Sequence, residues 1–206
     1  MFIVSFPRSG QHLLERLLKH IHNYYNKEFS YCEYYTCCQK IPCNKNSLFQ
    51  KNHDFNLNLK LNINEKFIII YRKNKIYQLE SLFRLNKFRK NVFNSNINYK
   101  DKETFNNLIR FIKNNSKYYD NFVDKYIKSN KYQQALIIEY DDFLSQYKNY
   151  IKKIILFLNL KNDKNIDLDI DLDIEIIINT FEKIEYKNKL DNEIYKQINK
   201  ILHLEI

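Results

Sequence analysis

The sequence is poor in the residues that turns commonly use, since its 206 residues include one glycine and two prolines. The Walker A phosphate-binding loop needs two glycines followed by a Lys-Ser/Thr pair, so this loop is absent. The single glycine, Gly10, lies between an apolar run typical of a strand and one typical of a helix. A chain that avoids glycine elsewhere is expected to keep it where no Cβ fits, in a tight turn or where backbone approaches a ligand.

Several features of nucleic-acid-binding and membrane proteins are also missing. The net charge of +10 favours polyanionic partners, but Lys and Asn are abundant along the whole chain and explain much of it. There is no Lys/Arg-only block, no aromatic RNA-binding signature and no zinc-finger spacing. No apolar run reaches membrane-spanning length, and Met1 leads into the first strand without a charged leader. We therefore expect a cytoplasmic protein with no nucleic-acid partner and no transmembrane segment.

The chain length suits one domain, 1–206, with a core of its own. All four cysteines fall between residues 32 and 43. Two disulfides would need an oxidising compartment that nothing else in the sequence supports, and the x4, x0, x4 spacing is not that of paired zinc knuckles. The sequence favours reduced, partly buried thiols and no metal, while zinc binding and disulfide pairing stay open. The four residues are Cys32, Cys37, Cys38 and Cys43.

Strand-like apolar runs alternate with helical patterns along most of the chain. Strands are predicted at 2–6, 67–71 and 135–139, and helices at 11–21, after 71, at 105–112, 118–127, through 150–158, at 175–181 and at 193–202. Either Asp141 or Asp142 is expected to cap the helix that follows the third strand. This order predicts an α/β domain with a largely parallel sheet, whose ligands bind at the carboxyl ends of the strands.

Three stretches carry no clear period. Residues 24–51, rich in Cys and Tyr, are predicted to be an irregular excursion over the edge of the sheet. The Asn-rich stretch 91–100 is expected to be a loop. In 166–174, Asp alternates with Leu or Ile, which indicates an exposed acidic strand or a loop.

The first turn has the composition of an anion-binding loop, because free N–H groups and the helix dipole attract an anion where a helix begins. Residues 6–10, Phe-Pro-Arg-Ser-Gly, followed by an apolar helix, resemble the 5′-phosphosulfate-binding loop of the sulfotransferase family. The resemblance implies the donor 3′-phosphoadenosine 5′-phosphosulfate and a three-layer fold like that of P-loop nucleoside triphosphate hydrolases. It implies that the donor is held by Pro7, Arg8, Ser9, Gly10, Gln11 and His12.

Three further segments follow in the order expected for the same family. Residues 49–55 resemble its Lys-Thr/Ser-His segment, which implies that His53 is the catalytic base and that Lys51 lies close to the donor. The strand ending in Arg72, with Ser81 on the next helix, resembles the segment that holds the donor's 3′-phosphate. Residues 135–160 resemble the family's strand, Tyr-Glu-Asp-Leu and Phe-Leu-Gly-Leu helix.

The chain also departs from the family pattern. Arg72 and Ser81 are one residue further apart than in the family, and one residue turns a helix by about 100°. Either the turn before the helix holds the extra residue, which the flanking Leu-Phe-Arg-Leu favours, or Ser81 is not a phosphate ligand. Gln-His-Leu follows Gly10 where the family has Thr-Thr and often an aromatic residue, and the family's C-terminal Arg-Lys-Gly is absent.

The residue types fit sulfuryl transfer to a hydroxyl, which needs a base for the acceptor's proton and cations beside the leaving phosphate. His53 suits the first role, and Arg8 and Lys51 suit the second, with no metal required. The acceptor could be a glycan, lipid, peptide or small molecule. Two alternatives remain: a non-catalytic nucleotide- or phosphate-binding protein on the same fold, and a P-loop-like phosphoryl-transfer enzyme, against which the absent Walker lysine argues.

Overall fold

The computed structural model describes residues 1–62, 64–88, 97–129, 131–160, 170–181 and 190–203. The chain forms two compact units, one of Met1–Tyr71 with Asn130–Ile184 and one of Arg72–Ser129 with Glu185–Ile206. The predicted loop at 91–100 and the acidic stretch 166–174 fall partly outside the described residues. No helix in the described ranges combines the length and apolar character needed to cross a bilayer.

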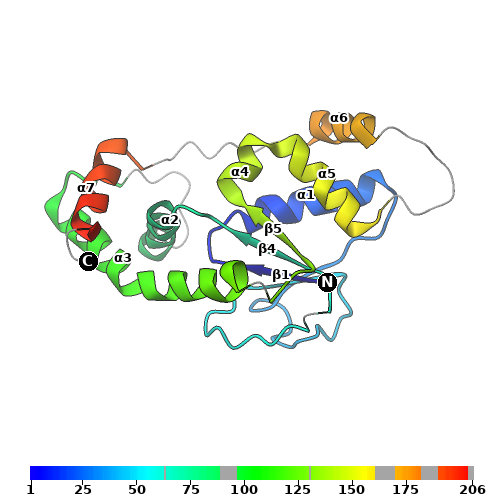
Figure 1. Ribbon diagram of the computed structural model, residues 1–206, viewed down its shortest axis with the longest axis horizontal. Coiled ribbons are helices and arrows are strands. Elements are labelled where there is room, and N and C mark those ends of the chain that lie inside the picture. Colours follow the sequence, from blue (N-terminus) through cyan, green and yellow to red (C-terminus); the bar gives the residue numbers. More distant parts are fainter. Residues whose placement is uncertain (63, 89–96, 130, 161–169, 182–189, 204–206) are drawn as a thin grey trace. The chain divides into compact units, whose positions relative to one another are not determined.

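The first unit contains a five-stranded sheet in the order β2-β3-β1-β4-β5, and every pairing described is parallel. Figure 1 shows β1, β4 and β5 side by side. The sheet with its flanking helices confirms the predicted α/β class and is consistent with a three-layer arrangement. The strands are β1 (Phe2–Ser5), β2 (Tyr31–Glu33), β3 (Phe49–Asn52), β4 (Phe67–Tyr71) and β5 (Ala135–Glu139).

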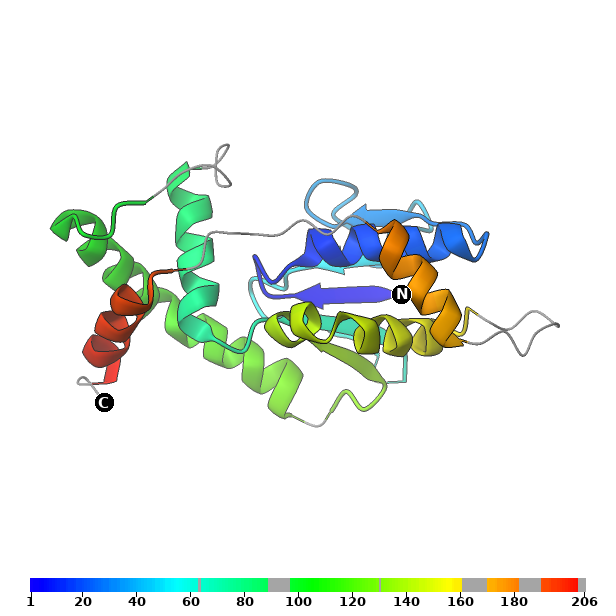
Figure 2. The ribbon, with the colours of Figure 1, turned by 90° about the horizontal axis from the view of Figure 1, so that it is seen from above.

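Apolar burial accounts for the central strands. Val4 of β1 is paired in register with Ile69 of β4, and both side chains are fully buried, as a strand covered on both faces requires. Helices α1 (Gln11–Tyr24), α4 (Tyr140–Ser145) and α5 (Tyr147–Leu158) cover one face of the sheet (Figures 1 and 2). The buried stripe of α1 is the one that the sequence predicts, namely Leu13, Leu14, Leu17, Leu18 and Ile21.

Three expectations for this unit need correction. The stretch 24–51 is not irregular throughout, because it contributes β2 and β3 to the sheet. The cap of α4 is Glu139, whose side chain accepts from the backbone N–H of Asp142, so neither Asp141 nor Asp142 is the cap. The described end of 166–174 begins a helix, α6 (Ile170–Thr180), in which Asp173 accepts hydrogen bonds from two tyrosines at the end of α1.

The regular secondary structure of the second unit, in its described residues, is helical. It comprises α2 (Lys75–Phe88), α3 (Lys102–Val123), the π-helical turn η1 (Asp124–Lys128) and α7 (Asn192–His203). The two helices predicted at 105–112 and 118–127 are one continuous helix that runs on into η1. Between α2 and the start of α3, Tyr99 donates a hydrogen bond to Glu80, which also forms a buried ion pair with Arg84.

Candidate functional site

The turn between β1 and α1 is closed by its own serine. The hydroxyl of Ser9 donates to the carbonyl oxygen of Phe6 at 2.8 Å, and the backbone N–H of Ser9 reaches the same oxygen at 3.3 Å. Arg8 adopts a φ of 70° and Gly10 a φ of 82°. Two left-handed residues within three positions make the turn abrupt, and such backbone is uncommon at an arginine. The turn points the chain from a central strand directly into a helix.

Gly10 is required by packing as well as by its backbone angle. A Cβ built on Gly10 would lie 2.1 Å from ring carbons of Tyr140, the first residue of α4. Carbon atoms do not approach so closely, so any larger residue must displace a buried ring. This confirms the prediction that the only glycine of the sequence stands where no Cβ fits.

The start of α1 exposes the backbone donors that an anion would use. The first helical hydrogen bond runs from the N–H of Leu14 to the carbonyl of Gly10 at 3.1 Å. No side chain of the described residues caps this end, and no acidic residue stands in the first turn. Gln11 is buried, and its Oε1 has no hydrogen-bond partner in the described part of the chain. The N–H groups of the first turn and the helix dipole together favour a negative ligand.

His53 lies at the carboxyl end of β3, the strand next to β1. Its Nδ1 lies 3.0 Å from the carbonyl oxygen of Ser5 and 3.0 Å from the hydroxyl oxygen of the same residue. A carbonyl oxygen only accepts, so Nδ1 carries the hydrogen and the neutral ring holds its lone pair on Nε2. Asp54 adopts a φ of 47° and its carboxylate accepts from the N–H of Leu59, which fixes the turn behind His53.

The ring of His53 is neutral near pH 7. Burial lowers the pKa of His53 to about 4, and the positive charge of Lys51 adds to the shift. Only 8% of the residue is exposed, so little water is available to stabilise an imidazolium. The neutral ring presents its Nε2 lone pair to a proton, and an anionic ligand bound beside it would raise its pKa toward the neutral range that suits a general base.

Lys51 is 1% exposed and forms an ion pair with Glu33 of the neighbouring strand. The two residues are register partners between β2 and β3. Burial lowers the pKa of the Lys51 ammonium, and the Glu33 carboxylate opposes this shift. Burial alone would raise the pKa of Glu33, but Lys51 holds it below its ordinary value. The pair is therefore charged, and each member neutralises the other within the edge of the sheet.

The structure groups some of the predicted residues and separates others by unit. Arg8 to His12 follow β1, and Lys51 and His53 lie on or just after β3, so all belong to the first unit at adjacent strands. His12 is exposed and its Nδ1 lies 3.6 Å from Glu15. Arg72 and Ser81 belong to the second unit, Arg72 ahead of α2 and Ser81 within it.

Sequence reasoning missed three contributors to the site. The sequence pattern places Ser5 within a strand but gives no sign that its carbonyl sets the tautomer of His53. Glu33 lies in a three-residue strand that the sequence pattern does not predict, and only the register reveals its pairing with Lys51. Tyr140 gives no sequence signal for its contact with Gly10, because that contact depends on how α4 packs.

Comparison with protein-family models gives no match, and comparison with curated proteins gives none either. A proposal about the function of this protein therefore rests on the sequence and the geometry of the chain itself.

Proposed function

We propose that the protein is a sulfotransferase that moves a sulfuryl group from 3′-phosphoadenosine 5′-phosphosulfate to a hydroxyl acceptor, on a fold like that of P-loop nucleoside triphosphate hydrolases. The observation that carries the proposal is the juxtaposition of two features at neighbouring strand ends. These are the Gly10 turn after β1 and a buried neutral histidine, His53, after β3. One feature suits an anionic donor, and the other suits removal of a proton.

The strand order supports this location. From β1 the chain passes to β2 and β3 on one side of the sheet and then to β4 and β5 on the other. In open α/β sheets, ligands bind outside the carboxyl ends of the strands where the connections change direction. In this sheet the change of direction occurs at β1, whose carboxyl end leads into the Pro7–Gly10 turn.

In the proposed complex, the backbone N–H groups of residues 10–12 and the guanidinium of Arg8 hold the 5′-phosphosulfate. The acceptor oxygen attacks sulfur and forms a new S–O bond while its proton passes to Nε2 of His53. The bond from sulfur to the bridging oxygen breaks, and its electron pair leaves on the 5′-phosphate. Preorganised donors around that oxygen lower the barrier, because the negative charge develops there.

Lys51 is the proposed cation beside the bridging oxygen. Its ammonium is already paired with Glu33, so donor binding must share or replace that contact. The resemblance in sequence implies that Arg72 and Ser81, both of the second unit, are the ligands of the 3′-phosphate.

Calorimetric titration with 3′-phosphoadenosine 5′-phosphate tests the proposal. We expect the wild type to bind, and Arg8→Ala to bind about 10- to 100-fold more weakly, as loss of a charge-assisted hydrogen bond predicts. Arg110→Ala, which removes an exposed arginine from α3, is the matched control and should bind as the wild type does. Absence of binding by the wild type, together with magnesium-dependent binding of ATP, would replace the proposal with a phosphoryl-transfer enzyme.

Two observations favour a second candidate, a phosphate-binding protein without catalysis. The Lys51 charge is neutralised by Glu33, and Gln11, His12 and Leu13 replace the family's usual residues after the glycine. Transfer of radiolabelled sulfate to a panel of glycan, lipid, peptide and small alcohol acceptors distinguishes the two. Tight binding of the nucleotide with no transfer to any acceptor would support the binding protein.

A further inference from the structure

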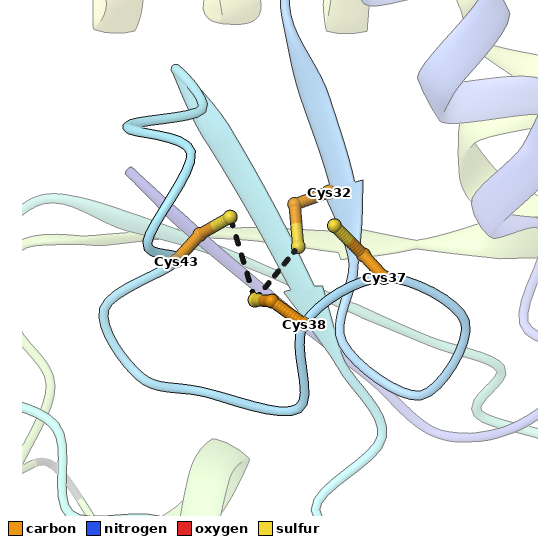
Figure 3. A group of neighbouring side chains, drawn as sticks. All are labelled: Cys32, Cys37, Cys38 and Cys43. Carbon is orange, nitrogen blue, oxygen red and sulfur yellow. Dashed lines mark hydrogen bonds between the residues drawn. The ribbon is translucent and has the colours of Figure 1, made fainter.

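We infer that Cys32, Cys37, Cys38 and Cys43 form a structural site for one Zn²⁺ ion at the edge of the sheet. The four thiols come from different parts of one segment. Cys32 lies on β2, Cys37 and Cys38 lie in the turn that follows it, and Cys43 lies in the loop before β3 (Figure 3). Their side chains point toward one another, although the loop between them extends away from the group (Figure 3).

The distances between the sulfur atoms fit a single tetrahedral ion. All four Sγ atoms lie within 4.8 Å of one another. The Sγ of Cys38 lies 3.9 Å from that of Cys32 and 3.5 Å from that of Cys43. A tetrahedron with Zn–S bonds of about 2.3 Å has S–S edges of about 3.8 Å, which falls between these two distances. A disulfide needs about 2.05 Å, and all four cysteines are free.

The loop that carries the cysteines is positioned by contacts that do not involve the thiols. The side chain of Gln50, on β3, accepts from the backbone N–H of Cys43 at 2.9 Å and donates to the carbonyl of Lys40. The backbone N–H of Cys37 bonds to the carbonyl of Glu33 at 2.9 Å. Both sides of the cluster are therefore tied to the sheet, so the thiols converge because the backbone brings them together.

The ligand chemistry selects the ion. Thiolates are soft ligands that favour zinc or iron over magnesium and calcium. Iron–sulfur clusters place thiolates on separate iron atoms, which spreads the sulfurs further apart than around one ion. Four protein ligands also fill the coordination shell and leave no position for water or substrate, as in structural zinc sites. The thiol spacing Cys-x4-Cys-Cys-x4-Cys is thus a four-ligand set, where sequence alone favoured separate reduced thiols.

The ion would fix the outermost strand of the sheet. β2 has only three residues, and a strand so short contributes little burial of its own. Cys32 precedes Glu33, the partner of Lys51, so an ion at Cys32 would also hold that carboxylate in place. The inference concerns stability of this edge and does not depend on the sulfotransferase proposal.

Metal analysis of the purified full-length chain, produced without a metal-binding tag, tests the site. We expect about one zinc per wild-type chain and less than about a tenth of that in Cys38→Ser/Cys43→Ser. Thr36→Ala is the control, because it alters an exposed residue beside Cys37 without removing a thiol, and it should retain its zinc. Iron in place of zinc in the wild type would overturn the choice of ion. Equal loss of zinc from the control and the double variant would overturn the ligand assignment.

Cobalt substitution in the wild type covers the case in which the double variant does not fold. After removal of zinc, Co²⁺ should give the intense visible bands of a tetrahedral thiolate site. A weak octahedral spectrum, or no change on addition of Co²⁺, would overturn the site. Neither measurement uses the nucleotide donor, so a zinc-loaded protein that ignores 3′-phosphoadenosine 5′-phosphate would refute only the proposed function.

Discussion

The centre and the edge of the sheet are held by different chemistry. In β1 and β4, the side chains of Val4, Ile68 and Ile69 are completely buried and apolar. In β3, Gln50 and Lys51 point to opposite faces of the sheet, and both are nearly as deeply buried but polar or charged. The side chains of the centre therefore contribute apolar burial, while those of the edge contribute hydrogen bonds and one ion pair.

The contrast between apolar and charged side chains predicts how pH and salt affect the stability of each region. Apolar burial is non-directional and depends little on pH or salt. A buried charge is stable only while its partner is present and ionised. The candidate site lies where the two regions meet, with the Gly10 turn following the apolar β1 and His53 following the polar β3. Its anion-binding half should therefore be more robust than its proton-transfer half.

The largest expected effect is at the apolar centre. Ile69→Ala should lower the free energy of unfolding by about 4 kcal/mol, because it removes a fully buried side chain and leaves a cavity. Urea denaturation at low and high salt measures the loss, which should be the same at both.

Ile137→Ala is the matched control, since Ile137 is the register partner of Ile69 on β5 but is 40% exposed. We expect it to lose about 1 kcal/mol or less, as a substitution at a partly solvated site does. Similar losses of unfolding free energy for Ile69→Ala and Ile137→Ala would show that burial does not make the centre of the sheet more sensitive than β5.

The same contrast explains how much the sequence could predict. The run at 67–71 identifies β4 with its observed bounds because a strand buried on both faces is apolar throughout. β2 has three residues, Tyr-Cys-Glu, which show no period, so its existence depends on pairing with β3. The uniqueness of Gly10 marks the turn, but its contact with Tyr140 arises from tertiary packing that no local pattern encodes.

The second expected effect is at the edge. Glu33→Gln keeps the shape of the side chain but removes the carboxylate that pairs with the Lys51 ammonium. Lys51 is 1% exposed, so water cannot replace that partner. Breaking a fully buried pair costs about 3–5 kcal/mol, and because the Glu33 side chain is 30% exposed we expect about 3 kcal/mol or slightly less. Urea denaturation at neutral pH measures it.

Glu175→Gln provides the comparison for an exposed pair, because Glu175 meets Lys148 with both side chains 50% exposed. Its expected cost is below about 1 kcal/mol. If Glu33→Gln and Glu175→Gln destabilise the protein equally, the Lys51 ammonium is better solvated than its burial indicates. The stability of the β2–β3 edge would then not depend on the Glu33–Lys51 ion pair.

The smallest expected effect concerns the pH dependence of the edge. The folded state lowers the pKa of His53 to about 4, so the unfolded chain binds a proton there at higher pH than the folded chain does. The stability that this histidine confers is complete above its unfolded pKa, near 6.5, and is lost as the pH falls toward 4. Between pH 7 and pH 5 the loss amounts to about 2 kcal/mol.

His53→Asn isolates this contribution, because the amide can still donate to the Ser5 carbonyl but does not titrate. Groups that do not interact with His53 change equally in both proteins and cancel when the two stability–pH curves are subtracted, while Glu33, whose charge acts on His53, contributes together with it. The difference curve should fall by about 2 kcal/mol from pH 7 to pH 5, by about 1 kcal/mol more to pH 4, and level off below that pH. A flat difference curve would mean that the pKa of His53 in the folded state is the ordinary one, and that burial does not lower it. A fall in the stability difference between pH 7 and pH 4 would instead show that burial beside the polar strand β3 keeps the His53 ring neutral.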